Sequence, residues 1–229
     1  MRRNILIGVG LLVLIAAGAG AWFFMSGDDG ASASAPISAV PLAQNASAPA
    51  GTLLFQIVPD QSEARFTLSE ELRGAPKTVV GATKQVAGQL SLSPSDLSAA
   101  QVGTIQINAR TFATDSTQRD RAIRNFILNT DSYELITFKP TGVSGLSGAA
   151  ELNKPLEFQL SGDLTIRDVT KPVVFTVSAK ADSESKLSGN ASATVNRGDF
   201  GLTIPNVPFV ANVGEQVQLE IDFVAEKVQ

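Results

Sequence analysis

Apolar and polar side chains alternate with a period of two through most of the chain after Thr52. The alternating runs are residues 64–68, 86–92, 105–110, 158–167, 173–179 and 218–226. Successive side chains of a strand point to opposite faces, so each run predicts a strand with one apolar and one polar face. An antiparallel sheet with one face in water has this pattern. We therefore predict one all-β domain over residues 52–229, which is long enough for a single sizeable core.

Two antiparallel architectures fit the alternation: a β-sandwich, and an up-and-down β-barrel whose closure removes the sheet edges. The runs are joined mostly by short turns, such as Ser93-Pro94-Ser95-Asp96 and Asp168-Val169-Thr170-Lys171. Short turns produce consecutive hairpins and therefore favour a meander or a barrel.

One segment departs from the alternation. Residues 115–118 offer a capped helix start, and residues 119–128 place apolar side chains on one helical face. These side chains are Ala122, Ile123, Phe126 and Ile127. We predict a short amphipathic helix that lies across an opening of the barrel or against its outer wall.

The N-terminal residues 1–27 predict a membrane anchor. Arg2 and Arg3 precede an apolar run over residues 5–25, and two aspartates follow at 28 and 29. About 20 apolar residues span a bilayer as a helix, and these flanking charges leave the N-terminus in the cytoplasm. We expect a single-pass protein of the cell membrane, with its domain on the extracytoplasmic side, periplasmic or extracellular.

A cleaved signal peptide is the alternative for the same residues. A small-residue cleavage site is available at Ala17-Gly18-Ala19 or Ala19-Gly20-Ala21, and cleavage there would make the protein secreted. Residues 22–25, Trp-Phe-Phe-Met, favour the anchor, because they extend the apolar run and place aromatic rings at interface depth. Residues 28–51 are rich in Ala, Ser, Gly and Pro and predict a disordered linker.

Composition removes several kinds of chemistry. The chain has no cysteine and no histidine, which excludes Cys/His zinc sites, Ser-His-Asp and Cys-His triads and thiol redox chemistry. No acidic cluster suggests a calcium or magnesium site. The net charge of −4 argues against nucleic acid as a partner. We expect no catalytic residue, no metal and no cofactor.

The segment Leu164-Thr165-Ile166-Arg167-Asp168-Val169-Thr170-Lys171-Pro172-Val173 joins two strand-like runs through a polar turn. It is similar to the hairpin LTIxGVTKPV of the YceI-like family, and it is the most specific of four stretches that resemble the family's sequence pattern in order. Glu134 and Asp168 depart from the pattern, because proline and glycine respectively are commoner there; the hairpin should survive, since Asp tolerates turn conformations. The other stretches are residues 62–90, residues 120–138, and Arg197-Gly198-Asp199-Phe200-Gly201-Leu202 with the final strand 217–225.

The resemblance implies a lipocalin-like β-barrel, because the family has that fold. Members with known ligands hold an isoprenoid or another long apolar molecule, so the resemblance implies a polyisoprenoid or other long-chain lipid as partner. The implied ligand-binding residues are Phe66, Leu90, Phe138, Phe158, Leu160, Leu164 and Phe175. A filled core stays open as the alternative, because eight-stranded barrels either pack their interior or hold one small ligand.

Arg121 and Arg124, with Arg119, suggest a site for the phosphate or polar head of a lipid at the barrel mouth, because arginine presents a fork of donors that suits phosphate. The alternative is a solvated helix face paired with Asp115, Asp120 or Asp131. In the hairpin turn, we expect Arg167, Asp168 and Lys171 only to hold the turn in water.

Three further alternatives remain at this point. The domain could be a β-sandwich or barrel without a ligand that contacts other envelope proteins. A carboxylate-dependent hydrolase is a less favoured reading, because adjacent strand residues such as Glu70 and Glu71 point to opposite faces. Homodimerisation occurs in the YceI-like family and stays open for this chain.

Overall fold

The computed structural model describes residues 34–42 and 51–228. The predicted anchor, residues 1–27, lies outside the described residues. Pro36–Gln229 forms one compact unit, and the described core of this unit lies between Leu53 and Ala225. The unit therefore carries its own core. None of the helices in the described ranges combines the length and the apolar composition that crossing a membrane requires.

The domain is a single antiparallel sheet of 13 strands, which confirms the all-β prediction. Neighbouring strands follow the order β4-β7-β8-β9-β10-β11-β13-β1-β5-β6, and β2 carries β3 and β12 beside β13. The strands are β1 Leu53–Ile57, β2 Glu63–Leu72, β3 Ala75–Thr83, β4 Val86–Ala87, β5 Gln89–Ser93, β6 Asp96–Val102, β7 Ile105–Asn108, β8 Leu135–Ser144, β9 Leu156–Ile166, β10 Val169–Ser183, β11 Lys186–Asn196, β12 Val210–Ala211 and β13 Gln216–Lys227.

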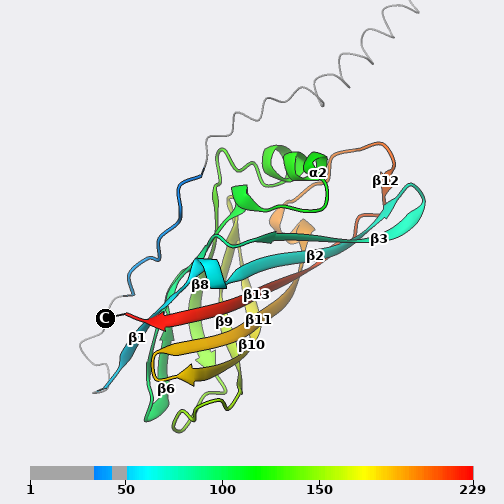
Figure 1. Cartoon of the computed structure of the whole chain (residues 1–229). Coiled ribbons are helices and arrows are strands. Elements are labelled where there is room, and N and C mark those ends of the chain that lie inside the picture. Colours follow the sequence, from blue (N-terminus) through cyan, green and yellow to red (C-terminus); the bar gives the residue numbers. More distant parts are fainter. Residues whose placement is uncertain (1–33, 43–50, 229) are drawn as a thin grey trace, which may run out of the picture. The chain divides into compact units, whose positions relative to one another are not determined.

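The sheet curls into a half-barrel that matches a lipocalin-like barrel (Figure 1). Residues 86–93 form one bent segment: β4 pairs with β7, and β5, beyond Gly88, pairs with β1. The Ile57 N–H donates to the Gly88 carbonyl over 3.0 Å at the bend. One segment thus pairs with both ends of the run of strands from β7 to β1 and keeps the sheet curved. The apolar side chains of the core lie on the inside of this curve.

A short helix interrupts the strands, as predicted. Helix α2 spans Thr117–Ala122 and continues as the π-helical turn η3, Ile123–Ile127. The Ser116 side chain caps it by accepting a hydrogen bond from the backbone N–H of Arg119. The start at residues 115–118 therefore caps the helix, as the sequence predicts.

The two ends of the half-barrel differ, and we name them by what they carry. The helix end carries α2, the β2–β3 turn at Arg73-Gly74 and the loop before β13, which Figure 1 shows together. The far end carries the loop between β8 and β9 and the β10–β11 turn.

Part of the predicted linker lies against the domain. The backbone N–H of Ile37 donates to the Gln85 side chain over 3.3 Å, and that of Leu42 to the Gln89 side chain over 2.8 Å. A Cβ built on Gly103 would lie 3.3 Å from a Leu42 methyl group. Residues 36–42 thus follow the outside of the bent segment 86–93 and its neighbours, beginning beside Gln85 near the helix end.

Glycines let phenylalanine rings lie flat on neighbouring strands of the sheet. A Cβ on Gly162 would stand 2.5 Å from Phe138 Cζ and 2.6 Å from the Lys139 carbonyl oxygen. Phe66 covers Gly81 in the same way. These rings fill the volume that the glycines leave, so a side chain at either glycine would collide with the core.

We expect Gly162→Ala to destabilise the domain by about 1–3 kcal/mol, because the added methyl group displaces the Phe138 ring or the backbone of β8. Gly142→Ala, on the neighbouring strand, is the matched control; nothing lies within 4 Å of its Cβ position. It should change stability by less than about 0.5 kcal/mol. Urea unfolding of residues 36–229 measures both, and equal effects would contradict the packing described for Gly162.

Candidate ligand-binding site

The seven residues predicted to bind a ligand belong to one hydrophobic cluster on the inner face of the curled sheet. Four are buried, at 3–7% exposure, and three are partly buried against them. The buried ones are Phe138, Leu160, Leu164 and Phe175, and the partly buried ones are Phe66, Leu90 and Phe158. The rings of Phe138 and Phe175 meet edge to face, with centroids 4.9 Å apart. The structure thus brings together residues from strands β2, β5, β8, β9 and β10.

Cross-strand pairing carries the inner face around the curve. Leu160 pairs with Phe175 between β9 and β10, and Val177 pairs with Ala191 between β10 and β11. Ala191 in turn pairs with Ile221 of β13. Directly paired residues share a face, so the apolar surface is continuous from β9 to β13.

The inner face is less filled along β11 and β13 than along β9 and β10. Inner-face residues of β11 include the small Gly189, Ala191 and Ala193, and both alanines are only partly buried. Ile221 and Phe223 of β13 are also partly buried, although they belong to the same apolar cluster. These apolar side chains lie in the middle of the sheet and still stay partly exposed. They mark the part of the inner face that could accommodate an apolar molecule.

The sequence-based selection missed this part of the site. It favoured large residues, and none of the seven lies on β11 or β13. The signal was present as the alternation of small residues along Lys186–Asn196, because small side chains lining a curved sheet leave space inside it.

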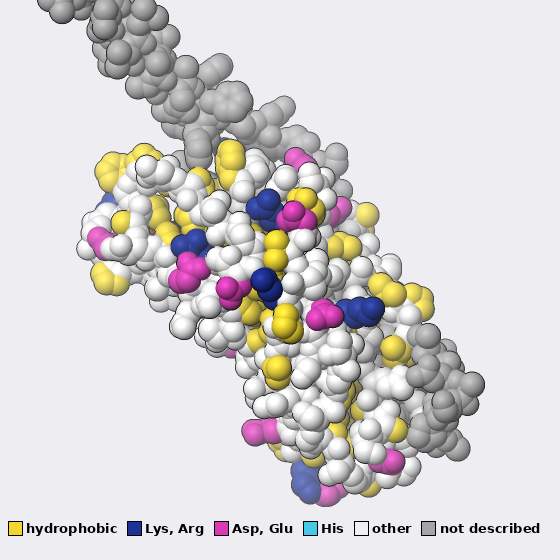
Figure 2. Space-filling view, turned by 180° about the vertical axis from the view of Figure 1, so that it is seen from behind, with side chains coloured by type: hydrophobic (Ala, Val, Ile, Leu, Met, Phe, Trp, Pro, Cys, Tyr) yellow, Lys and Arg dark blue, Asp and Glu magenta, His cyan; other side chains and the backbone are white. Residues whose placement is uncertain are grey.

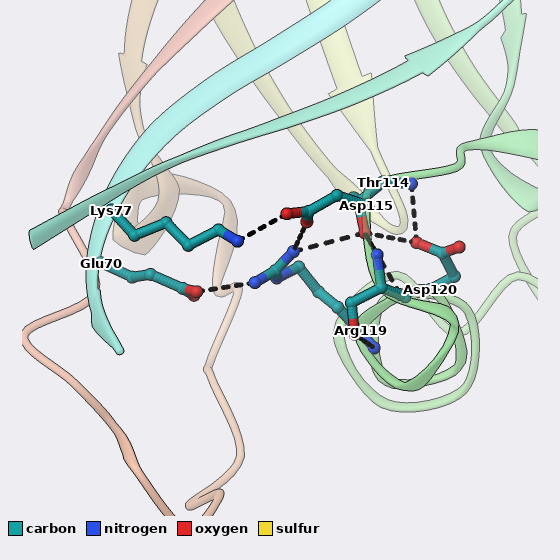
Figure 3. A network of polar contacts seen from close by, with 7 residues as sticks. Glu70, Lys77, Thr114, Asp115, Arg119 and Asp120 are labelled. Atoms are coloured by element: carbon teal, nitrogen blue, oxygen red, sulfur yellow. Dashed lines mark hydrogen bonds and ion pairs between the residues drawn. The ribbon is translucent and has the colours of Figure 1, made fainter. Parts of the chain in front are cut away.

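An ion network fastens α2 to the inner face of the β2–β3 hairpin (Figure 3). Arg119 donates to Glu70 over 2.7 Å and also pairs with Asp115, which accepts from Lys77 over 2.5 Å. Glu70 is buried on the same strand face as Phe66, because even-numbered residues of β2 share that face. The Thr114 backbone N–H and hydroxyl both donate to Asp120, at 2.8 and 2.7 Å.

The network decides the role of Arg119. Its guanidinium is committed to Glu70 and Asp115, which confirms the expected pairing with Asp115, whereas the expected solvated face is wrong for Arg119, because its side chain is mostly buried. The other two arginines also lie at the helix end: Arg121 on α2 and Arg124 on η3, both half-buried.

The carboxyl of Asp115 has a lowered pKa. The hydrogen bond from Lys77 contributes most, and that from Arg119 adds to it. Because the folded-state pKa lies below the ordinary value, Asp115 stabilises the network at pH above that value. The contribution is lost as the pH falls through the lowered pKa.

The hairpin that carries the family resemblance makes a two-residue turn, Arg167-Asp168, and Val169 already begins β10. The residue with positive φ is Arg167, at 57°, and not Asp168. The Arg167 guanidinium lies 5.8 Å from the ring centroid of Tyr133 and donates to the Ile127 carbonyl over 3.4 Å. The expectation that Arg167 only holds the turn in water is therefore wrong, because its side chain connects this hairpin to the end of the helix.

Lys171 also differs from that expectation. It pairs directly with the buried Leu164, so its place in β10 belongs to the inner face although the residue is exposed. Its neighbours on that face, Val169 and Val173, are apolar. An amine on this register can reach the helix end of the inner face, whereas Asp168 is exposed in the turn as expected.

The two candidate carboxylates for hydrolysis point apart, as expected for adjacent strand residues. Glu70 is engaged by Arg119, and Glu71 accepts from the Asn212 amide over 2.7 Å. Each therefore has a structural contact. Within residues 34–42 and 51–228, no three acidic side chains come together as metal ligands.

A curled antiparallel half-barrel with a continuous apolar inner face defines the lipocalin-like class of protein folds. The sequence matches the YceI-like domain over residues 55–225, and the chain belongs to this family. No curated protein matches the chain in sequence.

Solved structures share the fold at low sequence identity. A polyisoprenoid binding domain from Saccharophagus degradans, implicated in plant cell wall breakdown, superposes with a TM-score of 0.59 at 12% identity, covering 77% of this chain and 99% of that one. BcnA from Burkholderia cenocepacia gives 0.57 at 16% identity, covering 73% and 98%. A YceI protein from Campylobacter jejuni gives 0.52 at 17% identity, covering 65% and 84%.

We expect Arg119→Met to destabilise the domain by about 1.5–3 kcal/mol, because it leaves the buried Glu70 carboxylate without its charged donor. Lys154→Met is the control, since the Lys154–Glu151 pair is exposed and should contribute less than about 1 kcal/mol. Urea midpoints of both variants test this. If the urea midpoint falls no further in Arg119→Met than in Lys154→Met, the network does not stabilise the domain.

Proposed function

We propose that the protein is a lipid-binding protein that holds an isoprenoid or a similarly long apolar molecule along the inner face of its sheet. The observation that carries the proposal is the partly exposed apolar surface of β11 and β13, which continues from the packed side chains of β9 and β10. A continuous apolar surface inside a curled sheet is suited to an apolar ligand. The structural neighbour that is a polyisoprenoid binding domain supports this ligand class.

The length of the strands favours a long ligand over a compact one. Strand β11 has 11 residues and β10 has 15, so the inner face extends for about 35 Å along β11 at 3.3 Å per residue. Its apolar character continues through Leu187, Ala191 and Val195. The inner face of β11 carries no charged side chain, which suits an unbranched or prenyl chain lying lengthwise.

We also propose that residues 1–27 tether this domain to the membrane on the extracytoplasmic side. Support comes from the apolar run of residues 5–25 with two arginines before it and two aspartates after it. A tethered carrier works at the surface where its ligand dissolves. In this proposal the curled sheet surrounds the lipid in the way that a closed up-and-down barrel would.

Native mass spectrometry of residues 36–229 tests the binding proposal. We expect an additional mass that is released on denaturation and extracted by organic solvent. Ala191→Phe should abolish this mass or lower isoprenoid affinity at least about tenfold, because the ring fills the space beside Ile221. Ser192→Phe, on the opposite face of β11, should bind normally. A protein that carries no mass and binds no added isoprenoid, or equal loss in both variants, would reject the proposal.

We propose that cationic side chains at the helix end receive the polar head of the lipid. The candidates are Arg121 and Arg124 on the helix, and Lys171 on the inner-face register of β10. Arginine and lysine both bind phosphate, arginine with the more directional geometry.

Substituting these cations shows whether the helix arginines or Lys171 of β10 bind the head group. Arg121→Ala with Arg124→Ala should weaken binding of a phosphorylated isoprenoid about tenfold and leave the corresponding alcohol unaffected. Lys171→Met is measured in parallel by the same fluorescence titration. Unchanged affinity for the phosphorylated ligand in the double arginine variant would remove the arginines from the site, and a loss confined to Lys171→Met would assign the head group to β10.

A further inference from the structure

The segment between the short helical turn η4 (Arg197–Phe200) and β13 is unusually apolar for an exposed segment. We call residues 202–213 the apolar loop; it reads Leu-Thr-Ile-Pro-Asn-Val-Pro-Phe-Val-Ala-Asn-Val and contains no charged residue. Leu202 packs against the core, whereas the rest of the loop has no part in the proposed ligand contacts. Polar residues normally dominate such connections, so an apolar loop at the surface is a feature that the fold alone does not require.

Phe209 is held outward at the tip of this loop. At 73% exposure it is the most exposed large hydrophobic side chain of residues 34–42 and 51–228. Its φ is +70°, a conformation that residues other than glycine rarely adopt, so the surrounding contacts must hold it there. Figure 2 shows hydrophobic side chains gathered at the end of the molecule that carries the β2–β3 turn and this loop.

The contacts that hold Phe209 come from the β2–β3 hairpin. Strand β12 pairs with the end of β2, Val210 opposite Leu72 and Ala211 opposite Glu71. The Arg73 backbone N–H donates to the Phe209 carbonyl over 2.7 Å, and the Arg73 guanidinium lies 5.8 Å from the ring centroid. A fixed backbone therefore presents an aromatic ring with a cation beside it.

The place of the loop in the domain suggests what it meets. The loop lies at the helix end, and the described domain also begins near that end, where Ile37 is bonded to Gln85. Residues 26–35 separate Pro36 from the apolar run that ends at Met25, and ten residues reach at most about 35 Å. A bilayer that holds residues 5–25 is thus within reach of this end of the domain.

The chemistry of the loop fits a bilayer better than a protein partner. Aromatic rings beside arginine are typical of side chains at the membrane interface, where the ring enters the acyl boundary and the cation stays at the head groups. A specific protein interface buries about 800 Å² on each side, whereas this surface is one narrow loop with one projecting ring.

We propose that the apolar loop is a membrane-docking element that inserts Phe209 into the lipid interface and turns the helix end of the half-barrel toward the bilayer. A single aromatic ring docks only weakly, but a tether makes the contact intramolecular, with an effective concentration on the order of millimolar. The proposal adds to the proposed function a route by which an apolar ligand passes between bilayer and inner face.

The absence of cysteine from the chain allows a site-specific test. Ala211→Cys, in β12 next to the tip, and Glu151→Cys, beside the exposed Leu152 at the far end, each receive an environment-sensitive nitrobenzoxadiazole dye. The labelled full-length chains are reconstituted into phosphatidylcholine vesicles. We expect a blue shift and quenching by brominated lipid at position 211, and quenching by aqueous iodide at position 151.

A second substitution connects the signal to the ring. Phe209→Ser in the labelled Ala211→Cys chain should restore iodide quenching to the level of position 151, whereas Leu152→Ser should have no effect on position 211. Equal iodide access at 211 and 151 in the parent chains would overturn the docking proposal. A blue shift at 211 that needs no lipid and grows with protein concentration would overturn it in favour of a second copy of the chain.

The two proposals can fail independently. Phe209→Ser should retain the co-purifying mass in native mass spectrometry, because Phe209 does not line the inner face. Retained ligand without lipid contact at position 211 leaves the carrier and removes the docking element. Lipid contact at 211 in a protein that binds no isoprenoid leaves the docking element and removes the carrier.

Discussion

Strand register is the constraint on which the rest of the structure depends. Apolar residues on the inner face pair with one another across the sheet at several places, as Leu160 does with Phe175 and Ala191 with Ile221. A shift of one residue between any two strands would turn a whole strand's apolar side chains to water. The rings of Phe66 and Phe138 reinforce the register, because each lies over a glycine of the next strand, where any side chain would collide with it. The continuity of the inner face, and the place of the small residues of β11 on it, follow from this pairing.

The helix end is fastened by charges and not by apolar packing alone. Arg119 connects α2 to the buried Glu70, and Arg167 connects the β9–β10 turn to Tyr133. A buried charge with a single good partner specifies one arrangement, since other positions of the helix would leave Glu70 unpaired. The helix end therefore has one defined arrangement.

The period-two alternation was sufficient to predict the all-β class and several of the strands, and the helical spacing of apolar residues over 119–128 predicted the short helix, because these depend on local patterns. The four predicted residues Phe138, Leu160, Leu164 and Phe175 lie in the core for the same reason. The roles of Arg167 and Lys171 could not be predicted, because they depend on which residue takes positive φ in the turn and on pairing across β9. Residues 36–42 lie against the domain through hydrogen bonds to Gln85 and Gln89, which are distant in sequence. The composition of the segment does not predict such bonds.

In the proposed tethered chain, residues 36–42 would have a mechanical consequence. Their two described bonds, at Ile37 and Leu42, lie one after the other along the direction in which tension would pull. Load reaches the first bond before the second, so the segment would peel from the domain stepwise before tension reaches β1. Full release adds about 20–25 Å of extended chain, at roughly 3.5 Å per residue. The reach of the domain is thereby adjustable without unfolding any strand.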